Sequence, residues 1–93
     1  KILEMLVPLP KTIRSAGHHA LIQILVDERK RAGLTQADLA LKLHCNQSLI
    51  ARVESGERRI DAIELIILAR AIGVRPEELT LRVSAHVPDD EKL

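Results

Sequence analysis

The sequence predicts an all-α fold, and three observations carry that prediction. Hydrophobic residues make up 46% and charged residues 29% of the 93 residues, the balance of a folded globular protein. The chain contains no Phe, Trp or Tyr, so its core is aliphatic, which favours helices packed ridge into groove. Apolar residues recur at helical spacing in successive segments separated by turn-forming residues. Since this length allows one core, we predict an N-terminal arm (1–14), one five-helix domain (15–80) and a C-terminal tail (81–93).

The first two predicted helices have signals at their ends. Ser15 is a candidate N-cap, and Gly33 would end the first helix in a left-handed conformation. Thr35 and Asp38 have the spacing of a capping box at the start of the second helix. The apolar positions that define the helical faces are Ile22, Leu25, Val26 and Ala32 in the first helix, and Leu39, Ala40 and Leu43 in the second.

The other three predicted helices are marked in the same way. The third begins at Asn46 or Gln47, directly after the three-residue turn HCN. The fourth opens with a capping box of Asp61 and Glu64. Gly56 follows the third helix, Gly73 follows the fourth, and Pro76 takes the first position of the fifth. Ile50 and Val53 are expected to face inward from the third helix. Ile60 and Leu65 have the spacing of a hydrophobic staple at the start of the fourth.

The two ends of the chain depart from this helical pattern. Pro8 and Pro10 prevent a helix from running through the arm, where ILEMLV fits a short strand or, in part, a cloning remnant. Near the other end TLRVSAHV alternates, so it fits a strand or an extended tail. Residues 77–93 carry five acids and two bases, whereas residues 1–76 carry 12 bases and 8 acids, a charge of +4. A basic body of this kind suits an anionic partner.

Two short helices joined by a three-residue turn, between longer helices, have the layout of a helix-turn-helix motif. The segments GLTQADLALKL, NQSLIARVESGERR and LARAIGV closely resemble the phage repressor, Cro and Xre-type family over about residues 16–79. The resemblance implies a five-helix fold that binds duplex DNA, usually as a dimer on a two-fold-symmetric operator. Double-stranded DNA and a second copy of the chain are therefore the expected partners.

The start of the third helix is expected to contact base edges, because a recognition helix presents its N-terminal residues to the major groove. A Gln amide can bond adenine through two hydrogen bonds, Ser can bond either base type, and Arg can reach guanine or a phosphate. The resemblance places the base contacts at Gln47, Ser48 and Arg52, and Ala51 could touch a thymine methyl group. The alternative is that these are solvated polar residues on a short helix.

Phosphate contacts are expected beside this helix. The start of the second helix offers free amides and a favourable dipole to an anion, and the resemblance implies a backbone clamp there and a DNA-facing loop after the third helix. Glu57 lies in this loop, at a position where relatives often carry Lys, and its negative charge weakens the expected clamp on the DNA backbone. The alternative for the loop is a solvated charge run. In the arm, Lys11 and Arg14 fit either a minor-groove contact or a disordered tail. The expected phosphate contacts are Thr35, Gln36, Arg58 and Arg59.

Arg29 and Glu54 match a pair that joins the first and third helices in the family. Its expected role is to fix the angle of the recognition helix, since a buried pair contributes more to geometry than to net stability. His44 stands where relatives usually have Gly with a positive φ, which His adopts at some cost. Cys45 matches a buried apolar position, so we expect a packing residue rather than a redox sensor.

Ile63 and Ile67 form a second apolar stripe on the fourth helix, where relatives often carry polar residues. Such a stripe indicates that another surface packs there. The candidates are a partner in a homodimer or the chain's own terminal segments, and we expect the terminal extensions to help make the dimer.

A sequence-specific DNA-binding regulator, of which a repressor is the expected kind, is the leading prediction. The alternatives are an antitoxin whose termini bind a toxin and an interaction module that has lost DNA binding. No catalytic constellation or zinc spacing is present, so we expect neither an enzyme nor a metal or other cofactor. One cysteine allows no intrachain disulfide, and no signal peptide or membrane-spanning run is evident, which favours a cytoplasmic protein.

Overall fold

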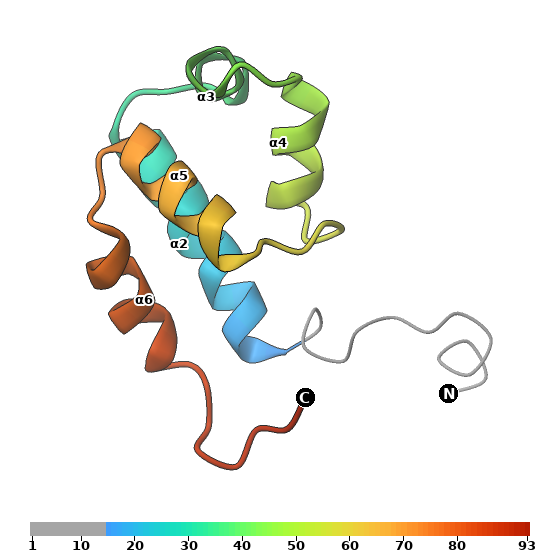
Figure 1. Cartoon of the computed structure of the whole chain (residues 1–93), viewed down its shortest axis with the longest axis vertical. Coiled ribbons are helices and arrows are strands. Elements are labelled where there is room, and N and C mark those ends of the chain that lie inside the picture. Colours follow the sequence, from blue (N-terminus) through green and yellow to red (C-terminus); the bar gives the residue numbers. More distant parts are fainter. Residues whose placement is uncertain (1–14) are drawn as a thin grey trace, which may run out of the picture.

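The computed structural model describes residues 15–93, which fold into five helices (Figure 1). No strand occurs within this range, so the all-α prediction is confirmed. In Figure 1, α3 and α4 lie at one end of the molecule and the C-terminal residues lie at the other. The helices are α2 (Ala16–Arg31), α3 (Gln36–Leu43), α4 (Gln47–Glu54), α5 (Ala62–Ile72) and α6 (Pro76–Ser84).

The N-terminal caps follow the sequence signals. Ser15 Oγ accepts a hydrogen bond from the backbone N–H of His18 at 3.1 Å. Thr35 and Asp38 form the predicted capping box on α3, with reciprocal bonds of 3.0 and 2.9 Å. Asp61 and Glu64 do the same on α5, at 2.8 and 3.1 Å. Each box satisfies amides that the first helical turn leaves without a partner, and so it fixes where the helix begins.

The turn between α3 and α4 depends on a left-handed residue. His44 has a φ of 55°, as the family position predicts, and is the one non-glycine with positive φ in the described range. The backbone N–H of Cys45 then bonds the carbonyl of Ala40 at 3.0 Å. With this geometry a connection of three residues, 44–46, is enough to turn the chain from the end of α3 into the start of α4.

The core is aliphatic throughout. Each helix contributes at least one side chain with no more than 3% exposure: Leu25, Leu39, Ile50, Ala69 and Leu79. Cys45, Ile60 and Leu65 are partly buried against this cluster, which agrees with packing at Cys45 and with the predicted staple. Ala32 is exposed instead, because it is the C-cap of α2 rather than part of its buried face.

The C-terminal region corrects one prediction. The first five residues of TLRVSAHV form neither a strand nor an extended tail, because α6 continues to Ser84. Leu79 and Val83, four residues apart, both pack inward, which is helical spacing. Arg82 Nη1 bonds the buried carboxylate of Glu28 at 2.9 Å and ties α6 to α2. Tertiary contacts therefore favour a helix over the alternating pattern.

After α6 the chain returns to the start of α2. A Cβ atom placed on Gly17 would lie 2.7 Å from Cγ2 of Val87, so glycine is what allows this close approach. The strand predicted in ILEMLV and the predicted contacts of Lys11 and Arg14 lie outside the described residues. None of the described helices is long and apolar enough to cross a membrane.

Candidate nucleic-acid interface

A buried ion pair joins α2 to the end of α4. Arg29 donates from Nε to Glu54 Oε2 at 2.6 Å and from Nη2 to Glu54 Oε1 at 2.8 Å. Its third nitrogen, Nη1, donates to the carbonyl of Leu34 at 2.8 Å. Both side chains are only 9% exposed. The hydrogen bonds to Glu54 raise the pKa of Arg29 above its ordinary value. The predicted pairing is therefore present.

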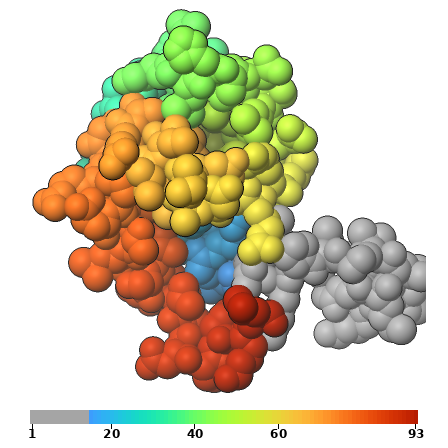
Figure 2. All heavy atoms as spheres, in the orientation of Figure 1, coloured from blue at the N-terminus to red at the C-terminus, as the bar shows by residue number. Residues whose placement is uncertain are grey.

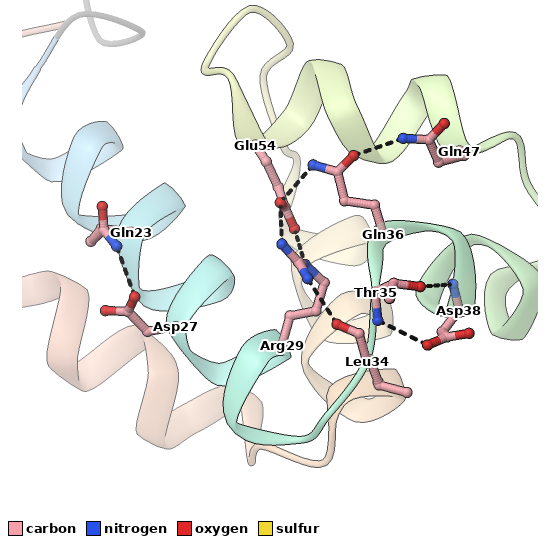
Figure 3. A network of polar contacts seen from close by, with 9 residues as sticks. All are labelled: Gln23, Asp27, Arg29, Leu34, Thr35, Gln36, Asp38, Gln47 and Glu54. Atoms are coloured by element: carbon pink, nitrogen blue, oxygen red, sulfur yellow. Dashed lines mark hydrogen bonds and ion pairs between the residues drawn. The ribbon is translucent and has the colours of Figure 1, made fainter.

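The ion pair continues as a chain of amides toward the start of α4 (Figure 3). Gln36 Nε2 donates to Glu54 Oε1 at 2.9 Å, and Gln36 Oε1 accepts from Gln47 Nε2 at 2.8 Å. The network thus connects α2, the first residue of α3, and both ends of α4. The sequence indicated the Arg29–Glu54 pair and the two glutamines. It did not indicate the bonds that Gln36 makes to Glu54 and to Gln47, because these depend on how α3 packs against α4.

The outward side of α4 carries the four predicted base contacts. Gln47, Ser48 and Arg52 are exposed and Ala51 is partly exposed, whereas Ile50 and Val53 face the core. Gln47 with Ala51, and Ser48 with Arg52, are four residues apart and so lie on adjacent ridges of one face. This face presents an amide, a hydroxyl and a guanidinium around a small methyl group, which is chemistry that can read base edges.

The loop after α4 separates the two arginines that were expected to contact phosphates. Arg58 donates to both carboxylate oxygens of Glu64, at 3.1 and 2.6 Å, and to the carbonyl of Arg59. Hydrogen bonds from Arg58 and from the backbone of Asp61 lower the pKa of Glu64 to about 2. Arg59 is exposed, as is Glu57. Arg58 therefore has a partner on α5 that the sequence analysis did not predict. The signal for it was Glu64, an acidic residue at N3 of α5 and six residues after Arg58.

The start of α3 is arranged in a similar way. Thr35 Oγ1 is used as the cap acceptor for Asp38, and Gln36 is partly buried within the amide chain. The backbone amides of the first turn of α3 remain the groups that can favour an anion there.

Apolar groups gather on a different surface. Ile63 and Ile67 on α5 are 67% and 49% exposed. A mainly apolar hollow of about 160 Å³ adjoins Ile67, and Leu43, Cys45 and Leu49 also line it. Figure 2 shows α5, in yellow to orange, running across the front of the molecule. The expected second apolar stripe is thus present at the surface.

Within residues 15–93 no group of three or more His, Cys, Asp and Glu side chains is placed to hold a metal ion. His18 is one of the four histidines in the sequence, and its Nε2 atom is buried without a hydrogen-bond partner. Burial is the main cause that lowers the pKa of His18, so this imidazole is a neutral packing group at pH 7.

Comparisons with known proteins agree with this architecture. The Helix-turn-helix family model matches residues 25–79. A solved XRE-family like protein from Pseudomonas syringae pv. tomato str. DC3000 is 40% identical, and the alignment covers 84% of this chain and 95% of that one, with a TM-score of 0.76. No sequence among the curated proteins matches. The chain belongs to the XRE-like, Cro/C1-type helix-turn-helix family, whose fold is that of DNA-binding transcription regulators.

Proposed function

We propose that this protein is a transcription regulator that binds specific duplex DNA sequences, acting as a repressor and as a homodimer on a palindromic operator. The observation that carries the proposal is the outward polar face of α4, held in place by the buried Arg29–Glu54 pair. A short helix anchored at both ends can enter the major groove as a rigid unit. Such a regulator acts in the cytoplasm, where bacterial DNA lies.

The base-reading groups are Gln47, Ser48, Ala51 and Arg52. Phosphates on one side of the groove meet Thr35 and Gln36 at the start of α3, where the helix dipole adds to the attraction. Phosphates on the other side meet Arg59. Arg58 contributes charge to that side while its guanidinium stays bound to Glu64.

A homodimer follows from the size of the domain. One recognition helix covers half an operator, so two copies related by two-fold symmetry would cover both half-sites. The exposed Ile63 and Ile67 supply apolar surface for that contact. Light scattering should therefore give a mass that rises from monomer to dimer with concentration, and Ile63→Asp should hold the chain at the monomer mass.

Selection of binding sites from random duplexes tests the function. The expected result is a palindromic motif whose half-sites are centred about 10 base pairs apart. Binding should weaken steeply with salt, because each neutralised phosphate releases counterions. An absence of salt-dependent binding to any duplex would contradict the proposal and favour the interaction-module alternative.

A further inference from the structure

The mainly apolar hollow that adjoins Ile67 is built by α3, α4, α5 and the turn after α3. The buried Ile50, Val53 and Leu68 line its inner side, and partly exposed apolar side chains surround them. At about 160 Å³ it is smaller than the roughly 300–1,000 Å³ of small-molecule pockets. A cavity of about 150 Å³ holds a molecule the size of benzene. The hollow therefore suits one or two aliphatic side chains of a polypeptide.

The N-terminal arm carries side chains of this kind. Five of the six residues in its segment ILEMLV, residues 2–7, are apolar, and each gains free energy when it leaves water. Pro8 and Pro10 favour an extended connection, because the residue before a proline avoids the helical region. At about 3.3 Å per residue, the eight steps from Val7 to Ser15 can reach about 26 Å.

The arm joins the domain close to the hollow. Burial is the main cause that lowers the pKa of His18, and the backbone of Gly56 and the charge of Arg59 also act on it. The first turn of α2 therefore lies against the loop after α4, and Figure 2 shows this loop, in yellow, beside the blue start of α2. Arg58 of the same loop lines the hollow. The path from Ser15 to the rim is one helical turn, one side-chain contact and two loop residues, on the order of 20 Å.

We propose that residues 2–7 of the arm dock in the hollow of their own chain and insert one or two apolar side chains beside Ile67. A segment tethered by a short connection meets the hollow at an effective concentration of about 1 mM, which favours the chain's own arm over that of a second copy. Ile63 does not line the hollow, so docking leaves it exposed for the proposed dimer contact. Docking of the arm is independent of DNA binding.

Cys45 provides the test, because it lines the hollow and is the one cysteine of the chain. Met5→Cys, Leu6→Cys and Val7→Cys each add a second thiol to the full chain. A disulfide needs Cα atoms within about 7 Å of each other, so mild oxidation should cross-link the docked segment within the monomer. One of the three positions should react about tenfold faster than its neighbour, because successive residues of an extended segment face opposite ways. An undocked arm would react at similar rates at all three, since one residue hardly changes the cost of loop closure.

Alkylation of Cys45 by a maleimide gives a second measurement that adds no thiol. Leu6→Asp should release the arm and raise the alkylation rate by about tenfold, the change in the docking equilibrium expected when one buried leucine is lost. Thr12→Asp is the matched control: it makes the same charge change in the same arm, outside the docking segment, and should keep the parental rate. Circular dichroism checks that both variants keep the helices.

Three results would overturn docking of the arm in its own chain. The first is an equal cross-linking rate at Met5→Cys, Leu6→Cys and Val7→Cys. The second is a folded Leu6→Asp protein whose Cys45 is alkylated no faster than in the parent. The third is a disulfide-linked dimer in place of the cross-linked monomer, which would place the arm of a second copy in the hollow. No DNA enters these measurements, so their failure is distinct from a failure of the proposed function.

Discussion

Two Arg–Glu pairs, one on each side of Gly56, have similar geometry and different surroundings. In both, the arginine makes two hydrogen bonds to the carboxylate, and the shortest N–O distance is 2.6 Å. Arg29–Glu54 is 9% exposed and joins residues 25 positions apart, whereas Arg58–Glu64 is about one-third exposed and joins residues six positions apart.

Burial and sequence separation together determine what each ion pair does in the fold. A buried charge left without its partner costs more than the pair itself contributes, so Arg29–Glu54 constrains how α2 and α4 meet. A pair that is about one-third exposed is screened by water and contributes little, so Arg58–Glu64 supports only the loop and the first turn of α5. The first pair therefore matters for the orientation of the reading face and the second for local order.

The largest expected effect is at the buried pair. Arg29→Ala should lower the free energy of unfolding by about 3–5 kcal/mol, because Glu54 is left buried and unpaired. It should also weaken operator binding. Urea denaturation, with binding measurements on the folded fraction, checks both effects. Full helicity with unchanged operator affinity would contradict a role for the buried pair in orienting α4.

A matched double variant separates the effect of the buried pair on stability from its effect on DNA binding. Arg29→Met with Glu54→Leu replaces both charges by apolar groups of similar size, so most of the lost stability should return. DNA affinity should stay low, because the amide chain has lost its anchor. If affinity returned together with stability, the pair would have no role beyond folding.

The more exposed pair, Arg58–Glu64, should give a smaller, pH-dependent effect. Glu64→Gln keeps the capping box, since Gln also serves at N3, but it loses the ion pair with Arg58 and should cost about 1 kcal/mol near pH 7 after allowance for solvent screening. The pKa of Glu64 is lowered from 4.5 to about 2 in the folded state. Its stabilisation is therefore present above pH 4.5 and is lost as the pH falls toward 2.

Thermal unfolding of both proteins from pH 7 to pH 2 measures this difference. The gap in Tm should be constant above about pH 5 and should close at the acid end. A gap that stays constant across the whole range would show that the Glu64 carboxylate is not stabilised by Arg58.

The smallest stability effect is expected at the exposed arginine of the same loop. Arg59→Ala should leave Tm unchanged but weaken binding to all duplexes alike and reduce the salt slope by about 1. Arg58→Ala should instead lower stability by about 1 kcal/mol and change the slope less, because its guanidinium is held by Glu64. Equal changes in slope would mean that both arginines contact phosphates to the same degree.

Local signals were enough to predict where most helices begin and end. Caps such as Thr35 with Asp38 act within four residues, so the sequence contains both partners. The prediction of a strand or an extended tail in TLRVSAHV is wrong for residues 80–84, because an alternating pattern over eight residues does not exclude a helix. The contacts that decide the matter, Leu79 in the core and Arg82 on Glu28, involve residues far away in the chain.

The candidate site was predictable as a set of residues but not as an arrangement. The resemblance supplied Arg29, Glu54, Gln36 and Gln47, and their roles in DNA binding stay predictions. The bond between the two glutamines spans 11 positions, and the pairing of Arg58 with Glu64 crosses a loop. Both depend on the packing of one helix against the next, which periodicity and capping signals do not describe.

An NMR titration of ¹⁵N-labelled protein with the selected operator shows whether the outward face of α4 reads duplex DNA. We expect the largest chemical-shift changes in the side-chain amide of Gln47 and in the backbone amides of Ser48 and Arg52, with smaller changes at Gln36 and Arg59. If the signals of these residues stayed unchanged and the changes centred on Ile63 and Ile67 of α5, the role of α4 in binding DNA would be contradicted.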